Sequence, residues 1–196
     1  MASKYKIVEI ASPKGVCHLT SIKNVKNWAY MQRGEPQAGR FPDNASFQMS
    51  DEFPKDIKLA DALANTNSFL IVSERFAEFL RAEKLLAHNE VHPVGIDNHK
   101  GRREKAPYFI IHQTDNPKCV DETKTVGRKS KLEPDEYAGM KKLVLDEKRV
   151  GRDYTIFRAA EYRDRILVRS DAAKKIEEAG FTGIVFHDLD DYDDYW

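Results

Sequence analysis

Short runs of apolar and β-branched residues, separated by Gly, Pro and polar residues, recur along the chain and predict a protein rich in strands. The predicted strands are Tyr5–Ile10, Ser46–Ser50, Phe69–Val72, Val91–Ile96, Pro107–His112, Lys141–Leu145, Tyr154–Phe157, Arg165–Val168 and Thr182–His187. The last of these is expected to be a buried strand. Gly and Pro interrupt residues 27–56, so we expect the least regular part of the fold there, although its aromatic residues argue against disorder.

Helical spacing of apolar residues occurs clearly in only two segments. One helix is predicted from Ser73, as its N-cap, to about Leu86. The other is predicted to be capped by Ser170–Asp171 and to run through Ala179, with Gly180 ending it. Many hairpin-like strands with few helices favour an α+β fold, with a mixed or antiparallel sheet and a few flanking helices.

One short sequence pattern is repeated within the chain. Leu70–Glu74 and Leu167–Asp171 both run from a strand through a serine to an acidic residue at the start of a helix. The two serines lie 170 − 73 = 97 residues apart. This pattern is common in proteins that mix strands and helices, so the sequence leaves open whether the fold has two similar strand-helix-strand halves.

Composition places the chain among globular proteins. Of its 196 residues, 41% are hydrophobic and 33% are charged. Lys and Arg together number 32, as do Asp and Glu, so no overall charge favours nucleic acid or a membrane. No apolar run approaches the roughly 20 residues that cross a bilayer, and no signal-peptide pattern is found. The two cysteines, Cys17 and Cys119, form no disulfide framework, so we expect a cytoplasmic, single-domain protein.

Charge is nevertheless unevenly distributed. The last ten residues carry five Asp and no Lys or Arg, which leaves 32 basic and 27 acidic residues before them. The basic excess gathers in Lys100–Lys105, Lys124–Lys131 and Lys141–Arg152. Acidic tails are often merely solvated, but aromatic residues between the acids are typical of interfaces. The residues predicted to contact a partner are Asp188, Asp190, Asp191, Tyr192, Asp193, Asp194, Tyr195 and Trp196.

No pattern in the sequence indicates a catalytic or metal site. His88 and His92 are four residues apart, but Pro93 favours an extended chain, in which they are about 13 Å apart. Cys17 is next to His18, yet sequence neighbours rarely have the geometry of a nucleophile and its base. The terminal aspartates lack the glycine and closing glutamate of a calcium loop. We therefore expect no catalytic residue, no metal and no cofactor.

From Ser68 to His187 the chain resembles bacterial polymorphic-toxin immunity proteins of the immunity-protein-eleven type. The segments that carry the resemblance are Phe69–Ala82, His88–Val94, Ala106–Ile111, Cys119–Asp121, Ile156–Arg158 and Ala179–Phe186. The resemblance implies a small protein that binds a cognate toxin and occludes its active site. It also implies delivery of that toxin by a contact-dependent system such as type VI secretion. The family supplies no catalytic residues to carry over.

The sequence then divides into three parts. Residues 1–67 are expected to be an irregular N-terminal part packed on the core, residues 68–187 the immunity-type α+β domain, and residues 188–196 an acidic aromatic tail. The expected partner is the toxin, with no membrane, and the sequence leaves open whether the chain forms a homodimer.

Two alternatives to an immunity protein remain at this stage. A hydrolase or transferase would need His88, His92, His112 or a cysteine to converge in a pocket. A regulator that binds nucleic acid, which the balanced charge disfavours, would need Lys100–Lys105 and Lys124–Lys131 on one continuous face.

Overall fold

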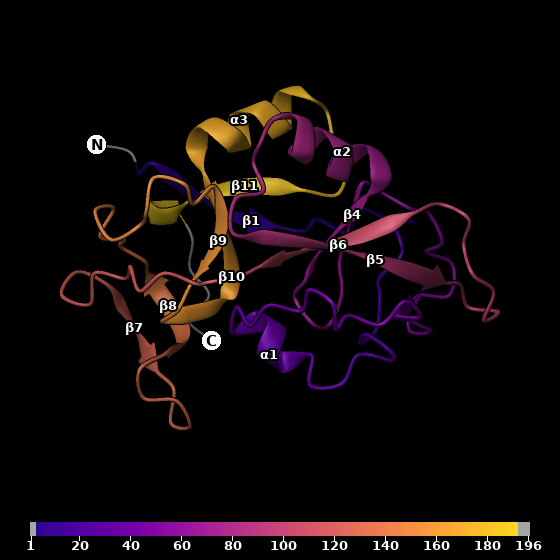
Figure 1. The fold of residues 1–196 in the computed structure, drawn as a ribbon, viewed down its shortest axis with the longest axis horizontal. Coiled ribbons are helices and arrows are strands. Elements are labelled where there is room, and N and C mark those ends of the chain that lie inside the picture. The colour runs from indigo at the N-terminus through magenta and orange to yellow at the C-terminus, as the bar shows by residue number, and fades with distance from the viewer. Residues whose placement is uncertain (1–2, 192–196) are drawn as a thin grey trace.

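The computed structural model describes residues 3–191, which form an α+β fold of mixed and antiparallel sheets with a few helices, as predicted (Figure 1). The strands are β1 (Tyr5–Glu9), β2 (Ser46–Gln48), β3 (Ala62–Leu63), β4 (Leu70–Ser73), β5 (Asn89–Asp97), β6 (Tyr108–Gln113), β7 (Val126–Lys129), β8 (Tyr137–Lys142), β9 (Ile156–Ala159), β10 (Tyr162–Arg169) and β11 (Val185–Asp188). The helices are α1 (Ala29–Gln32), α2 (Glu74–Ala82), α3 (Ser170–Glu178) and the short 3-10 helix η1 (Leu189–Asp191).

Two larger sheets organise these elements. One is antiparallel, with the strand order β11-β1-β10-β9. The other has the order β2-β5-β6-β4-β3, and all of its pairs are antiparallel except the parallel pair β2–β5. Strands β7 and β8 form a separate hairpin.

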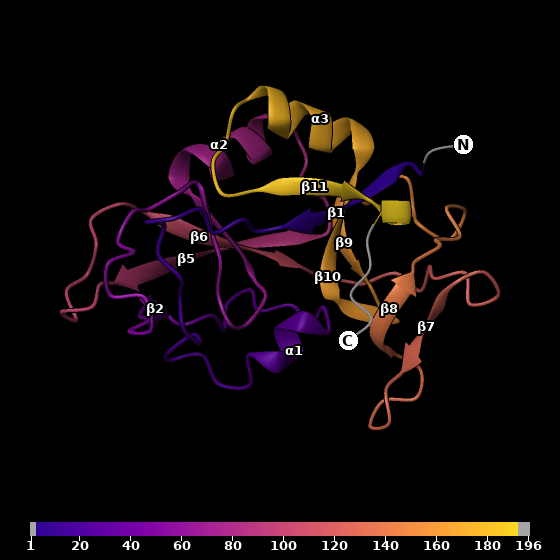
Figure 2. The same ribbon diagram turned by 180° about the vertical axis from the view of Figure 1, so that it is seen from behind.

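The five-stranded sheet is covered on both faces. Helix α2 lies over one face, with α3 beside it over β1 and β10 of the four-stranded sheet, while α1 and the N-terminal loops lie under the other face (Figures 1 and 2). The alternation of side chains in β4 follows from this arrangement. Leu70 and Val72 join the hydrophobic cluster under the helices, whereas Ile71 joins the cluster with the N-terminal segment. This explains why the strand is apolar at every buried position.

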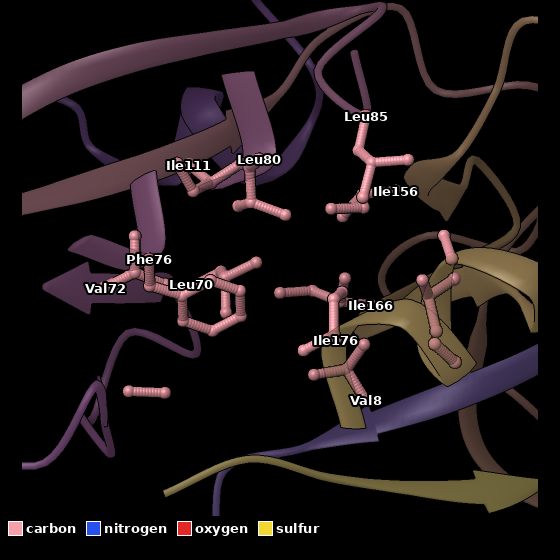
Figure 3. Packing of buried hydrophobic residues seen from close by; sticks show 14 of the residues in the cluster. Val8, Leu70, Val72, Phe76, Leu80, Leu85, Ile111, Ile156, Ile166 and Ile176 are labelled. Atoms are coloured by element: carbon pink, nitrogen blue, oxygen red, sulfur yellow. The ribbon is translucent and has the colours of Figure 1, made fainter. Parts of the chain in front are cut away.

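Both sheets contribute to the cluster under the helices. Figure 3 shows Val8 of β1 and Ile166 of β10 facing the side chains of Phe76 and Leu80 on α2 and Ile176 on α3. All these residues are at most 8% exposed. The cluster therefore holds the two sheets and two helices together as one core.

The repeated sequence pattern corresponds to a repeated arrangement of strands and a helix in the structure. In each larger sheet, an antiparallel pair (β3–β4 or β9–β10) leads into a helix and then into a strand two places along the sheet. An antiparallel strand, β6 or β1, lies between the strands before and after the helix. The two halves thus share one strand topology.

Several predicted elements differ from the structure. The strand predicted at Lys141–Leu145 is β8, which ends at Lys142; two alternating buried leucines beyond it imitate a strand. The strand predicted to be buried at Thr182–His187 begins at Val185 and is an edge strand, with Val185 itself 38% exposed. Strands β3 and β7 were not predicted.

The ends of the helices also differ from the predicted ones. Helix α2 ends at Ala82 and not at Leu86. Ser73 occupies the N-cap position, but its hydroxyl donates to the Oδ1 atom of Asp61 and caps no helical N–H. Helix α3 already begins at Ser170, with Arg169 at its N-cap. At the start of α2, the hydrogen bond to Asp61 thus uses the Ser73 hydroxyl that local capping would need.

Candidate functional site

The described part of the predicted acidic tail is anchored to the fold. Asp188 is the last residue of β11, opposite Lys6 of β1, and its Oδ1 lies 3.1 Å from the Lys6 Nζ. Leu189 is buried in a third hydrophobic cluster, whereas Asp190 and Asp191 are exposed. The expectation that the last strand ends before Asp188 is therefore wrong. The other predicted contact residues, Tyr192, Asp193, Asp194, Tyr195 and Trp196, lie outside the described residues.

An acidic cleft of about 660 Å³ lies between the loops that precede β7 and β8 and the turn between β9 and β10. Its carboxylates belong to Asp121, Glu122, Asp135, Glu136, Asp146 and Glu161. Lys118 and Arg149 are its basic lining residues. Leu189 and Val120 belong to the same hydrophobic cluster, so η1 and the acidic cleft are built on one part of the molecule.

Neighbouring cations balance most of the carboxylates in the acidic cleft. The Nζ of Lys124 lies 2.7 Å from Asp121 Oδ2, and hydrogen bonds, chiefly from that lysine, lower the pKa of Asp121 to about 2. Glu122 pairs with Lys129 at 2.6 Å, Asp146 pairs with Arg149 at 3.1 Å, and Glu136 pairs with Arg163. The cleft therefore presents paired charges of both signs, which suit polar recognition, and not a strong field of one sign.

A second polar group joins strands β5 and β6. Glu90 is directly opposite His112 in the strand register, and His92 is two residues along β5 on the same face. Glu90 Oε2 lies 3.0 Å from His92 Nε2 and 3.3 Å from His112 Nδ1. These three residues, which we call the Glu90 cluster, place one nitrogen or oxygen atom each within 4.8 Å of one another.

The N-terminal segment closes over the Glu90 cluster. The backbone N–H groups of Gln37 and Ala38 donate to the Glu90 carboxylate at 2.7 and 3.2 Å. Phe41 stacks on His92, with 4.2 Å between ring centroids. The cluster therefore links the loop around residues 37–41 to the five-stranded sheet.

Burial sets the protonation of the Glu90 cluster. Burial lowers the pKa of His92 and of His112, in spite of the nearby carboxylate. Burial also tends to raise the pKa of Glu90, but hydrogen bonds from Gln37 and from His92 outweigh it and lower that pKa. Two neutral imidazoles beside a carboxylate are the result at neutral pH.

From the sequence, only His88 and His92 were considered as a histidine pair, and they were judged too far apart in an extended chain to share one metal ion. In the structure His88 lies just before β5, with a φ of +58°. His88 instead stacks on Tyr154, at 4.2 Å between ring centroids. The informative signal was the spacing of Glu90 and His92, because residues two apart share a face of a strand. The third member, His112, comes close to them only through the pairing of β5 with β6, and this pairing cannot be read from the sequence.

The cysteines are not activated nucleophiles. Both are fully buried and unpaired. Burial raises the pKa of the Cys17 thiol to about 11 and that of Cys119 to about 12, so both are protonated at neutral pH. None of the described histidines lines the acidic cleft.

The basic segments do not form one face. The loop that contains Lys100–Lys105 and the hairpin that contains Lys124–Lys131 are at opposite ends of the long axis (Figure 1). Within them, Arg103 pairs with Asp97 at 2.6 Å, and lysines pair with acids of the cleft. The arrangement that the nucleic-acid alternative requires is therefore missing from residues 3–191. No helix in that range is long and apolar enough to cross a bilayer.

Comparison with known proteins now identifies the family. A family model described as Immunity protein family (Imm11) matches residues 7–191, and no curated protein matches the chain. The matched range begins well before Ser68, so it includes β1 and the irregular N-terminal segment as well as both larger sheets. The resemblance to immunity proteins seen in the sequence is confirmed, and the chain belongs to the Immunity protein family (Imm11).

Proposed function

We propose that this protein binds a cognate bacterial toxin and neutralises it by covering its active site. The observation that carries the proposal is the immunity-family match, which spans residues 7–191 and thus nearly the whole described fold. The enzymatic activity that is blocked belongs to the toxin, so the immunity protein itself needs no catalytic site. We further propose that it acts in the cytoplasm, against an effector of a contact-dependent or type VI secretion system.

The proposed toxin-binding surface is the C-terminal region, from Asp188 through Trp196, together with the neighbouring acidic cleft. Asp190 and Asp191 are exposed and supply the negative charge, while the cleft, whose carboxylates are mostly paired with cations, provides further polar groups on the same part of the fold. Tyr192, Tyr195 and Trp196 supply aromatic groups of the kind that form interface anchors. We expect the toxin to present a basic surface that complements the exposed aspartates, in the way that acidic inhibitors bind basic enzymes.

Protection against a lethal enzyme requires tight binding. Nanomolar affinity corresponds to about −12 kcal/mol, which an interface of about 1,600 Å² reaches when a few buried anchors dominate. Exposed aspartates contribute only about 0.2–1 kcal/mol each. We therefore expect the aromatic residues to set the dissociation rate and the aspartates to raise the association rate.

The test begins with the protein encoded in the neighbouring reading frame. The two products are co-expressed, co-purified and measured by calorimetry and by association kinetics at low and moderate salt. Removing residues 192–196 keeps Leu189 in place and is expected to weaken binding at least tenfold. The double variant D190N/D191N is expected to slow association, and more so at low salt.

The matched control removes two charges elsewhere. The double variant E52Q/E177Q changes two exposed carboxylates, on a loop and on α3, and should bind like the natural protein. Equal affinity of the shortened and full chains would remove the tail from the interface. Failure of the full chain to bind the toxin or to protect cells would overturn the function itself.

A further inference from the structure

The Glu90 cluster has hydrogen-bonding geometry that a protein-only arrangement leaves incomplete. His112 Nε2 lies 3.0 Å from the backbone oxygen of Met31, which can only accept a hydrogen bond. The proton of a neutral His112 is therefore on Nε2. Its Nδ1 then presents a lone pair to Glu90 Oε2, 3.3 Å away, which is also an acceptor. His112 is 2% exposed, so bulk solvent does not relieve this contact.

We propose that Glu90, His92 and His112 bind a divalent transition-metal ion of the zinc class. The ligand atoms are Glu90 Oε2, His92 Nε2 and His112 Nδ1, and two imidazoles with one carboxylate form a ligand set that Zn²⁺ uses. When the ion binds, the neutral His92 ring carries its proton on Nδ1, and Nε2, which in the metal-free chain hydrogen-bonds Glu90 Oε2, offers its lone pair. The site is independent of the proposed toxin-binding surface.

The distances suit such an ion. Tetrahedral zinc with bonds of about 2.0–2.1 Å holds neighbouring ligand atoms about 3.3 Å apart. The two separations from Glu90 Oε2, 3.0 Å to His92 Nε2 and 3.3 Å to His112 Nδ1, are close to that value. The third pair of ligand atoms, on the two histidines, lies within 4.8 Å. A small movement of the histidine rings therefore completes the geometry.

The surroundings also match those of metal ligands. The His112 Nε2–H group donates to Met31 O, and this bond fixes the ring so that Nδ1 faces the site. The carboxylate of Glu90 is held by the N–H groups of Gln37 and Ala38. Its side chain is 20% exposed, which gives a fourth ligand, such as water, a route from solvent.

The proposed ion has a structural consequence. Met31, Gln37 and Ala38 belong to the irregular N-terminal segment, whereas the ligands belong to β5 and β6. The ion therefore connects that segment to the five-stranded sheet. Because it binds the folded chain and not the unfolded one, it raises the melting temperature with its concentration.

The experiment uses the full chain, stripped with a chelator and then titrated with Zn²⁺ or Co²⁺. We expect one ion per chain with a dissociation constant in the micromolar range or below, a raised melting temperature, and the visible absorption of tetrahedral Co²⁺. Hydrogen exchange of the backbone in residues 31–41 should slow when the ion is bound. The variants E90Q and H92N should each weaken Zn²⁺ binding at least tenfold. If one of them fails to fold, the other still tests the site.

The control is H88N, which removes a histidine four residues from His92 without touching the cluster. His88 has a φ of +58°, a backbone conformation that asparagine tolerates well, so the fold should be kept. This variant should bind Zn²⁺ like the natural chain. Absence of stoichiometric binding by the natural chain, or equal binding by E90Q and H92N, overturns the proposal. Neither result bears on the binding of the toxin.

Discussion

At the scale of single residues, Arg158 shows how the two larger sheets are joined. It is 1% exposed and lies on β9, where its guanidinium donates to Gln113 Oε1 on β6 and to the backbone oxygens of Ser68 and Arg163. Burial lowers its pKa to about 10, so it remains a cation at neutral pH. The charge is thus stabilised by neutral acceptors drawn from both sheets.

Asp61 forms a second junction between the halves of the chain. Its carboxylate accepts two hydrogen bonds from Arg75, both at 2.6 Å, and others from Ser73 and Thr182. Burial tends to raise the pKa of Asp61, but the bonds from Arg75 and Thr182 outweigh it and hold that pKa far below its usual value. Folding therefore favours the ionised form.

We predict that D61N lowers the free energy of unfolding by about 2–3 kcal/mol at pH 7, because the charge-assisted hydrogen bonds are lost. The folded pKa is below the unfolded value of about 3.9, so the stabilisation is fully present above pH 4 or 5 and is lost as the pH falls further. Urea unfolding at pH 7, 4 and 2.5 measures this. The exposed D153N is the control, and a difference that stays constant down to pH 2.5 would contradict the prediction.

The sequence revealed which residues are apolar or acidic, but not which of them meet. The acidic C-terminal residues stand out because charge composition is a local property. Asp61 and Arg75 gave no such signal, since their pairing depends on how β3 meets the start of α2. The same holds for His92 and His112, which are brought together only by the register of β5 with β6.

At the scale of elements, Gly183 decides where β11 begins. Its φ is +82°, and a Cβ atom there would lie 2.2 Å from the backbone oxygen of Ala62. The segment before β11 can thus pass close to β3 only if residue 183 is glycine. This contact explains why the strand predicted from Thr182 begins three residues later, at Val185.

We predict that G183A lowers the free energy of unfolding by about 2–4 kcal/mol, from backbone strain together with the collision with Ala62. The matched control is G180A, at a φ of +68° with no atom within 4 Å of the added methyl group. It should cost only the backbone strain, about 1 kcal/mol. Chemical denaturation measures both, and equal losses would mean that the close approach to Ala62 is unimportant.

Helix ends illustrate why sequence patterns place elements better than they assign contacts. The apolar periodicity located α2 and α3 correctly, because each helix must bury one face. Ser73 and Ser170 were expected to cap them, but the Ser73 hydroxyl donates to Asp61 and that of Ser170 donates to the backbone oxygen of Ser3. Partners more distant in sequence thus displaced a local interaction of similar strength.

At the scale of the whole molecule, the shared topology of the two halves determines which parts of the chain depend on one another. In one half the intervening strand, β6, follows β5 directly in sequence. In the other half the intervening strand is β1, which is separated from β10 and β11 by most of the chain. The second half therefore becomes complete only when the N-terminus is present.

We predict that residues 68–196 alone do not fold cooperatively, although they contain most of the secondary structure. Without β1, strands β10 and β11 have no partner between them, and Ile7 and Val8 are missing from two hydrophobic clusters. Circular dichroism during urea unfolding should show a broad, non-sigmoidal change for this fragment. A chain ending at residue 191 is the control and should unfold in one sharp transition like the full protein. A sharp transition of the fragment would mean that the N-terminal segment is an accessory to an autonomous domain, because the sheet would then tolerate the loss of a central strand.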